Sequence, residues 1–336
     1  MKIALDVMGG DFAPEETVKG AVEATKETDT TIILVGRKEQ IEKELKKYDF
    51  KSDQIEIFHT EQIIDMHEHP AFAVREKENS SIVQGIKLLK EGRVDGMVSA
   101  GNTGAVMSSA LLYLGRIQGI NRPAIATVLP TITSHPSLIL DIGANVDCKK
   151  EWLEQFAIMG KIYMEEIFNV KEPKVALLSI GEEEGKGNLL VQETTNLFKT
   201  NPLLNFVGNI EGKDLLRGIA DVIICDGFVG NIAIKTAEGV AEIMFELLSS
   251  EMKSSTWSKI LGGLLTPKFK GIKRYLDYSE FGGAPLLGIN EPVIISHGRS
   301  KAKAIKNAIK LAEKVINQKV NRKIYDSLKK LIERGN

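Results

Sequence analysis

The chain has 336 residues, of which 43% are hydrophobic and 26% are charged, values that are ordinary for a globular protein. A chain of this length can bury about three quarters of its unfolded surface, so we expect one large domain or two closely joined ones. Lys and Arg number 44 against 45 for Asp and Glu, which excludes a general attraction to nucleic acid, and no apolar stretch is long enough to span a membrane.

Strand and helix patterns alternate along the chain. Amphipathic segments near 38–47 and 71–90 predict helices between apolar runs that predict strands. The predicted strands are residues 2–7, 31–35, 55–58, 94–99, 137–141, 174–179 and 221–225. This alternation is typical of a parallel sheet covered by helices on both faces. The predicted fold class is therefore α/β, with residues 1–336 forming a single three-layer α/β/α domain.

A glycine-rich loop, within the sequence DVMGGDFAP, follows the first strand. Asp6 ends the strand, and Asp11 follows Gly9 and Gly10, two positions at which a positive φ is free. Because ligands bind to α/β sheets at the loops after the carboxyl ends of strands, this loop is a candidate site. A tight turn in which Asp11 caps the next helix is the alternative.

A second loop of this kind, SAGNTG, follows the strand at 94–99. Its glycines and the start of the next helix would turn backbone N–H groups toward a phosphate or an oxyanion. Asn102 and Thr103 add side-chain donors beside Gly104. The loop matches neither the P-loop nor the dinucleotide-binding G-x-G-x-x-G pattern, so we expect no nicotinamide cofactor. A helix simply capped by Asn102 or Thr103 is the alternative.

Three later strands end in the same way, with small and polar residues. These are Asp141 and Asn145 after 137–141, Lys186, Gly187 and Asn188 after 174–179, and Asp226, Gly227 and Asn231 after 221–225. Lys186 can bring a cation to an anionic substrate. We expect all five strand ends to converge on one face of one sheet.

The two cysteines, Cys148 and Cys225, lack the spacing of a metal site. Cys225 lies in an apolar strand, where a thiolate is disfavoured. We therefore expect no metal and no cysteine nucleophile. The cysteine usage, and a first apolar run unlike a signal peptide, predict a cytoplasmic protein.

The motifs DVMGGDFAP, SAGNTGA, DIGANVD, KGN and DGFVGN, in this order, resemble the bacterial phosphate acyltransferase (PlsX) family from Met1 to about Gly298. The resemblance implies a homodimer with a Rossmann-like fold similar to isocitrate and isopropylmalate dehydrogenases and to phosphotransacetylases. It implies reversible formation of acyl-phosphate from fatty acyl-[acyl carrier protein] and inorganic phosphate. It further implies that a membrane glycerol-3-phosphate acyltransferase of the PlsY type uses the product in phospholipid synthesis. Many relatives have His where this chain has Phe12, which excludes a catalytic histidine there.

Phosphate is the nucleophile in such a reaction, so the protein must hold a dianion beside a thioester and stabilise an oxyanion. No covalent acyl-enzyme and no cofactor are required. The expected catalytic residues are Asp6, Asp11, Lys186, Asp226 and His297. The expected substrate- or phosphate-binding residues are Gly9, Gly10, Arg75, Lys77, Asn102, Thr103, Gly104, Asp141, Asn145, Gly187, Asn188, Gly227 and Asn231. Arg75 and Lys77 match the family's pattern, and a surface helix of mixed charge is their alternative role.

A basic amphipathic helical hairpin is predicted within residues 251–280, broken by glycines and a proline. Its expected contact residues are Trp257, Leu261, Leu264, Lys268, Lys270 and Lys273. Such a segment suits an anionic membrane surface, which would make the protein peripherally membrane-associated. Contact with acyl carrier protein or with the second subunit is the alternative.

Two other functions fit the same residues. One is a phosphotransacetylase-like activity on acyl-coenzyme A, and the other is anion binding without catalysis, since fold does not fix function. The choice of acyl donor depends on contacts with the carrier protein, which the sequence does not locate.

Overall fold

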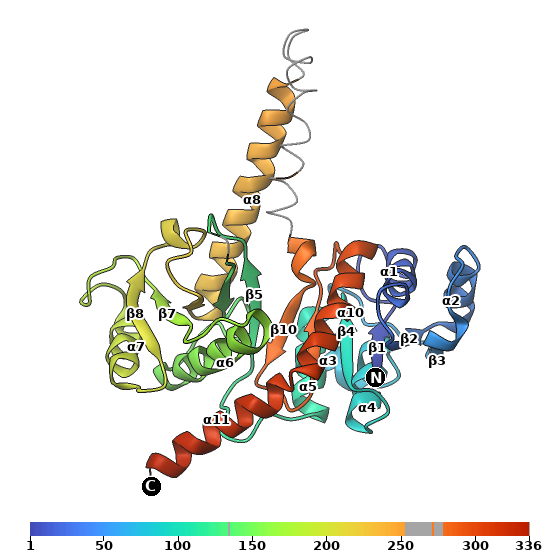
Figure 1. Cartoon of the computed structure of the whole chain (residues 1–336). Coiled ribbons are helices and arrows are strands. Elements are labelled where there is room, and N and C mark those ends of the chain that lie inside the picture. Colours follow the sequence, from blue (N-terminus) through green and yellow to red (C-terminus); the bar gives the residue numbers. More distant parts are fainter. Residues whose placement is uncertain (134, 253–270, 272–277, 336) are drawn as a thin grey trace.

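The structure, a computed structural model, describes residues 1–133, 135–252, 271 and 278–335 (Figure 1). The contact residues predicted for the hairpin, Trp257, Leu261, Leu264, Lys268, Lys270 and Lys273, lie outside the described residues.

The described strands form one eleven-stranded sheet in the order β3-β2-β1-β4-β11-β10-β5-β6-β9-β7-β8. The strands are β1 (Lys2–Asp6), β2 (Thr31–Gly36), β3 (Ile55–His59), β4 (Gly96–Ser99), β5 (Ala124–Leu129), β6 (Ser137–Leu140), β7 (Lys174–Leu178), β8 (Asn205–Ile210), β9 (Val222–Ile224), β10 (Ala284–Leu287) and β11 (Val293–Ile295). The helices are α1 (Glu15–Thr25), α2 (Lys38–Leu45), α3 (Pro70–Glu76), α4 (Ser81–Lys90), α5 (Thr103–Tyr113), α6 (Lys150–Phe168), α7 (Leu189–Thr200), α8 (Gly227–Glu251), α10 (Ala302–Asn317) and α11 (Val320–Gly335). Helices cover both faces of the sheet, which confirms the α/β/α fold class.

The sheet is mixed, so the prediction of a wholly parallel sheet is wrong. Strand β10 is antiparallel to both β11 and β5, and β5 is antiparallel to β6. These three reversals make β6, β7 and β9 run opposite to β1 and β4. The sequence analysis did not predict β5 and β10, and each is joined to its successor by a loop too short for a parallel crossover. The five strand ends therefore do not all meet at one edge of the sheet, as was expected.

The predicted helix at 71–90 is two helices, α3 and α4. Ser80 ends the interruption between them, because its side chain accepts a hydrogen bond from the N–H of Val83 and caps α4. Residues 77–80 therefore form a loop between the two helices.

The central strands are buried on both faces, which explains their apolar sequences. Ile3 and Leu5 of β1 and Ile305 and Ile309 of α10 are fully buried in one large cluster. The amino-terminal strand and a helix from the end of the chain therefore share a core, and α10 packs beside α1 in Figure 1.

Helix α8 projects from the body of the molecule in Figure 1. Its outer half carries exposed apolar side chains at helical spacing, namely Val240, Ile243, Met244, Leu247 and Leu248. Within the part of the chain that the structure describes, none of the helices combines the length and the apolar character needed to cross a membrane.

Candidate functional site

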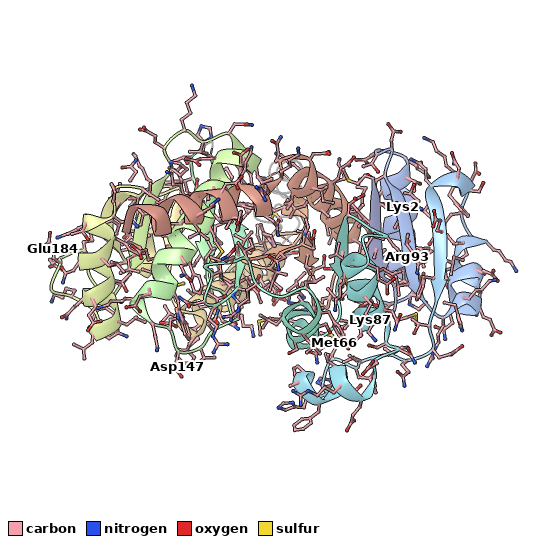
Figure 2. The ribbon with its side chains drawn as sticks, turned by 90° about the horizontal axis from the view of Figure 1, so that it is seen from below. Lys2, Met66, Lys87, Arg93, Asp147 and Glu184 are labelled. Carbon is pink, nitrogen blue, oxygen red and sulfur yellow. The ribbon has the colours of Figure 1, made fainter. Side chains whose placement is uncertain are left out.

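The predicted site residues fall into two groups, at the carboxyl ends of two oppositely directed sets of strands. The first group surrounds the loops after β1 and β4, and the second surrounds the loops after β6, β7 and β9. Ile142 and Ala144 of the second group pack against the same buried cluster as Met107 and Leu111 of α5. Figure 2 shows Met66, near the first group, and Asp147, near the second, toward the same side of the molecule.

Asp6 lies at the centre of the first group and is fully buried. The Oγ of Ser99 donates a hydrogen bond of 2.7 Å to its Oδ2, and the N–H of Met8 donates one of 3.1 Å to its Oδ1. A Cβ on Gly9 would lie 2.3 Å from that Oδ2, so only glycine fits there. Burial raises the pKa of Asp6, although these hydrogen bonds lower it. Asp6 thus joins two loops, and its carboxylate is closed off from solvent.

Asp11 and His297 come from opposite ends of the chain but lie in adjoining segments. The N–H of Asp11 donates a hydrogen bond of 2.8 Å to the carbonyl oxygen of Gly298, and both Asp11 and His297 are exposed. Gly10, with a φ of 103°, lets the loop approach so closely that a Cβ there would lie 3.1 Å from the same oxygen. The structure therefore brings together two residues that were predicted separately.

Several predicted binding residues of the first group have structural partners. Asn102 caps α5 through its Oδ1, and its Nδ2 donates to the carbonyl oxygens of Asp65, Met66 and Glu68. Lys77 is paired with Glu68 at 2.5 Å and also donates to a backbone carbonyl. These two side chains hold the loop at 65–68, which supports the structural alternative for each. Arg75 and Thr103 remain exposed, whereas Gly104 faces Pro70.

Asp141 organises the second group in the same way that Asp6 organises the first. Its buried carboxylate accepts five hydrogen bonds, from the N–H groups of Ile125, Gly143, Ala144 and Asn145 and from the Nδ2 of Asn145. Burial raises the pKa of Asp141, and the hydrogen bonds oppose that effect. The N–H of Gly227 donates to the carbonyl oxygen of Asn145 at 2.7 Å, which ties the loops after β6 and β9 together.

The first turns of α8 carry the predicted Asp226 and Asn231. Asp226 caps the helix by accepting a hydrogen bond of 2.8 Å from the N–H of Val229. Asn231 is half-buried, and its Nδ2 lies 3.0 Å from where a Cβ on Gly143 would be. Gly143 has a φ of 137°, so this position tolerates only glycine. The amide of Asn231 consequently faces the loop that Asp141 organises.

The loop after β7 presents Lys186 between three acidic residues and a capped helix. Two of those acids have partners elsewhere, because Glu182 pairs with Lys213 and Glu184 with Lys199. Among the residues that the structure describes, no carboxylate pairs with exposed Lys186, so its charge is available to an anion. Asn188 caps α7 through its Oδ1, at 2.9 Å from the N–H of Val191.

A cavity of about 270 Å³ lies between this loop and the start of α8. Gly187 and Asn188 line one side of it, and Asp226 and Val229 line the other. Ser179 also lines it, and its buried Oγ has no hydrogen-bond partner within the described residues. The sequence analysis overlooked Ser179, although its position directly after the strand could have drawn attention to it. The loop that carries Lys186 and the loop that carries Asp226 therefore border the same cavity.

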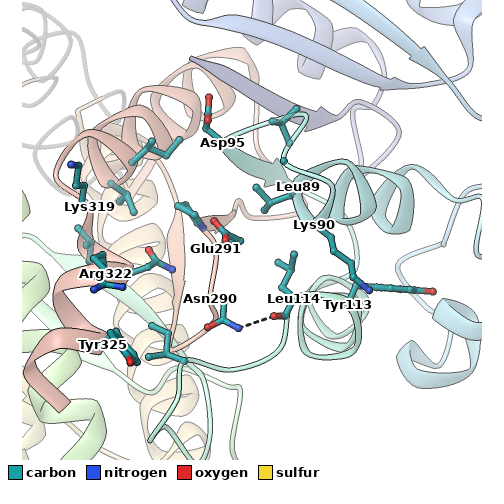
Figure 3. A pocket seen from close by; sticks show the side chains of 18 residues that line it. Leu89, Lys90, Asp95, Tyr113, Leu114, Asn290, Glu291, Lys319, Arg322 and Tyr325 are labelled. Atoms are coloured by element: carbon teal, nitrogen blue, oxygen red, sulfur yellow. Dashed lines mark hydrogen bonds between the residues drawn. The ribbon is translucent and has the colours of Figure 1, made fainter. Parts of the chain in front are cut away.

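A larger cavity of about 860 Å³ lies at the opposite ends of β4 and β11, and none of the predicted site residues lines it (Figure 3). Figure 3 shows Asn290 donating a hydrogen bond of 2.8 Å to the carbonyl oxygen of Leu114 at its wall. Its charged lining is of both signs, with Lys90, Lys319 and Arg322 beside Asp95 and Glu291. This mixture favours no single class of ligand, and we do not assign it to the site.

Neither cysteine is suited to be a nucleophile. Burial raises the pKa of the Cys148 thiol to about 12, with Asp141 and Asp226 adding to the effect, and raises the pKa of Cys225 well above its ordinary value. In the described parts of the chain, no group of three or more His, Cys, Asp or Glu residues is placed to hold a metal ion.

Comparison with known proteins gives consistent matches. The family model described as "Fatty acid synthesis protein" matches residues 1–323. A phosphate acyltransferase of Dictyoglomus thermophilum is 72% identical over 100% of both chains, and one of Halothermothrix orenii is 49% identical over 93% of both. Among solved structures, a phosphotransacetylase from Streptococcus pyogenes has a TM-score of 0.64 at 22% identity, over 94% of both chains. A 4-hydroxythreonine-4-phosphate dehydrogenase from Klebsiella pneumoniae has a TM-score of 0.51 at 14% identity, over 94% of this chain and 99% of that one. These two structures share the fold.

Proposed function

Since this chain belongs to the fatty acid synthesis protein family, whose relatives are phosphate acyltransferases, we propose that it transfers a fatty acyl group from acyl carrier protein to inorganic phosphate. The reaction is reversible and supplies acyl-phosphate for phospholipid synthesis. The observation that carries the proposal concerns Lys186, whose cation pairs with no described carboxylate and whose loop borders the same cavity as the capped start of α8. A phosphate dianion needs such a cation close to backbone and amide donors.

Two residues act on the reactants in this proposal: Lys186, which was expected to be catalytic, and Asn231, which was expected to bind substrate or phosphate. Lys186 holds the phosphate, and the Nδ2 of Asn231 donates to the oxyanion that forms on the thioester carbonyl. Asp6 and Asp141 are positioning residues, since both are buried and bonded to the loops that follow their strands. Asp226 is also a positioning residue, because it caps the start of α8. Asp11 and His297, exposed and adjacent, complete the site on the first group of loops.

The chemistry needs no group beyond these. An oxygen of hydrogenphosphate attacks the thioester carbon, and the C=O electron pair moves onto the carbonyl oxygen. When the C=O bond re-forms, the C–S bond breaks and its electron pair leaves on sulfur. The hydrogenphosphate proton ends on that sulfur, so the products are acyl-phosphate and the free thiol of the carrier. Holding both reactants in this geometry supplies most of the rate enhancement.

We propose that the protein acts as a homodimer through the exposed apolar stripe of α8, because a contiguous apolar surface of this kind is seldom left in water. Replacing Ile243 and Leu247 by Glu should convert the dimer to a monomer in light scattering. A dimer that persisted would show that the subunits contact each other through a different surface.

We further propose that the segment 251–280, basic and amphipathic in sequence, contacts an anionic membrane surface, where a glycerol-3-phosphate acyltransferase receives the product. Replacing Trp257 and Leu261 by Glu should abolish co-sedimentation with anionic vesicles. Unchanged binding would favour the carrier protein or the second subunit as the partner of this segment.

The experiment that tests the function follows acyl-phosphate by hydroxylamine trapping. Palmitoyl-acyl carrier protein or palmitoyl-coenzyme A is supplied with and without phosphate. Phosphate-dependent product from the carrier-protein donor alone is expected. Product from the coenzyme A donor would instead favour a phosphotransacetylase-like activity. No product from either donor would favour anion binding without catalysis.

A further inference from the structure

The cavity of about 270 Å³ beside the Lys186 loop has an apolar interior. Its inner wall is formed by Leu153, Leu177 and Cys225, which are 1%, 0% and 3% exposed. Leu178, Leu190 and Val191 complete this wall. Its volume equals that of about nine waters at roughly 30 Å³ each. Water placed against this wall would lack polar partners, so the interior favours an apolar occupant.

Polar side chains line the cavity on both of its sides. Oδ1 of Asn188 caps α7, and Oδ1 of Asp226 caps α8. The Oγ of Ser179 lies 3.1 Å from where a Cβ on Gly187 would be, next to Lys186 in the chain. It is buried, and no described residue bonds to it. This hydroxyl is closed off from the cavity, so the surface that a ligand would meet inside is largely apolar.

Exposed apolar side chains border the cavity. Ile180 and Val229 line it while being 82% and 38% exposed, and Leu189 and Phe228, their neighbours at the starts of α7 and α8, are also exposed. Apolar residues around an apolar cavity are typical of a site for an extended apolar ligand.

We propose that this cavity binds the acyl chain of the substrate, with the thioester toward the loop that carries Lys186. The inference rests on the proposed function, and it identifies the acyl-chain subsite and the residues that set chain-length preference. A chain segment of about nine methylenes fills the cavity, since a methylene is similar in size to a water. The remainder of a longer chain lies on the exposed residues Ile180, Leu189 and Phe228.

Val229 offers the sharpest test, because it borders the cavity on a helix and is partly exposed, so that a larger side chain can be accommodated without disrupting the core. Val229→Trp should block the cavity. Each excluded methylene lowers kcat/KM about four-fold, so octanoyl- and palmitoyl-acyl carrier protein should lose at least about ten-fold relative to the butyryl donor. Val207→Trp, on β8 and also partly exposed, is the matched control and should leave the chain-length profile unchanged.

Equal losses across chain lengths in Val229→Trp would overturn the proposal.

Binding measured without turnover separates this inference from the proposed function. Calorimetric titration with decanoate should show binding to the wild type and to Val207→Trp and a loss of at least about ten-fold in Val229→Trp. If the wild type forms no acyl-phosphate but decanoate binding still depends on Val229, the acyl site stands and the proposed reaction fails. If the enzyme is active and decanoate binds Val229→Trp as it binds the wild type, the acyl site is wrong.

Discussion

Ser99 donates a hydrogen bond of 2.7 Å from its Oγ to Oδ2 of Asp6, and thereby joins the loops after β4 and β1. The same Oγ accepts a hydrogen bond of 3.0 Å from the N–H of Gly101. All three groups are buried, so no water can replace a lost partner.

Ser99→Ala should therefore lower the free energy of unfolding by about 1–3 kcal/mol, because it takes one hydrogen-bond donor from a buried carboxylate and the acceptor from the buried N–H of Gly101. Urea denaturation of wild type and variant measures the difference. Ser108→Ala, on the half-buried face of α5, is the control and should change stability by less than about 0.5 kcal/mol. Equal stability of Ser99→Ala and wild type would contradict the joining role.

Lys186→Ala should raise the KM for phosphate and lower kcat/KM by about a hundred-fold, because it removes the cation that holds the dianion. Initial rates at varied phosphate measure the effect. The control is Lys199→Ala, which removes an exposed lysine paired with Glu184 and should leave the kinetics unaltered. A Lys186→Ala enzyme with a normal KM for phosphate would remove Lys186 from the site.

The two asparagines of the second group should respond differently to the same change. Asn231→Ala should reduce kcat by about ten- to a thousand-fold at unchanged stability, as expected for loss of an oxyanion donor. Asn145→Ala should instead lower the free energy of unfolding by about 1–3 kcal/mol, since its Nδ2 bonds to Pro123 and Asp141 in the interior. Parallel kinetics and thermal denaturation distinguish these outcomes, and a stability loss in Asn231→Ala would argue for a structural role.

Glu27 connects α1 to α10, and its pKa predicts how the stability from this contact depends on pH. Hydrogen bonds from Lys306 and then Lys310 lower its pKa from 4.5 to about 2. A carboxylate with a lowered pKa stabilises the fold above its unfolded pKa, and that stabilisation is lost as the pH falls from 4.5 to about 2.

Glu27→Gln should therefore cost less than about 1 kcal/mol at neutral pH, since the Glu27 carboxylate is exposed, and this cost should shrink toward zero as the pH falls to about 2. Denaturant titrations at both pH values test this. A cost that is independent of pH would show that packing, and not charge, explains the contact.

The sequence predicted the positions of the glycine-rich loops well, because a strand that ends in an acid and is followed by glycines is a local pattern. It did not predict the direction of the strands, which depends on pairing between distant segments such as β10 with β5. The roles of the site residues were also beyond reach. Asn102 and Lys186 look alike in the sequence as polar loop residues. Both polar atoms of the Asn102 side chain are hydrogen-bonded, however, while the charge of Lys186 has no described partner. Ser179 is ordinary in sequence and becomes notable only because its Oγ is buried beside a cavity.

The central claim is that phosphate attacks the acyl thioester of the carrier protein directly. The most direct measurement is to quantify free carrier thiol and hydroxylamine-trapped acyl-phosphate together, with and without phosphate. The account predicts equal amounts of the two products, and neither when phosphate is omitted. Thiol released without phosphate, or an acylated enzyme trapped before phosphate is added, would contradict it.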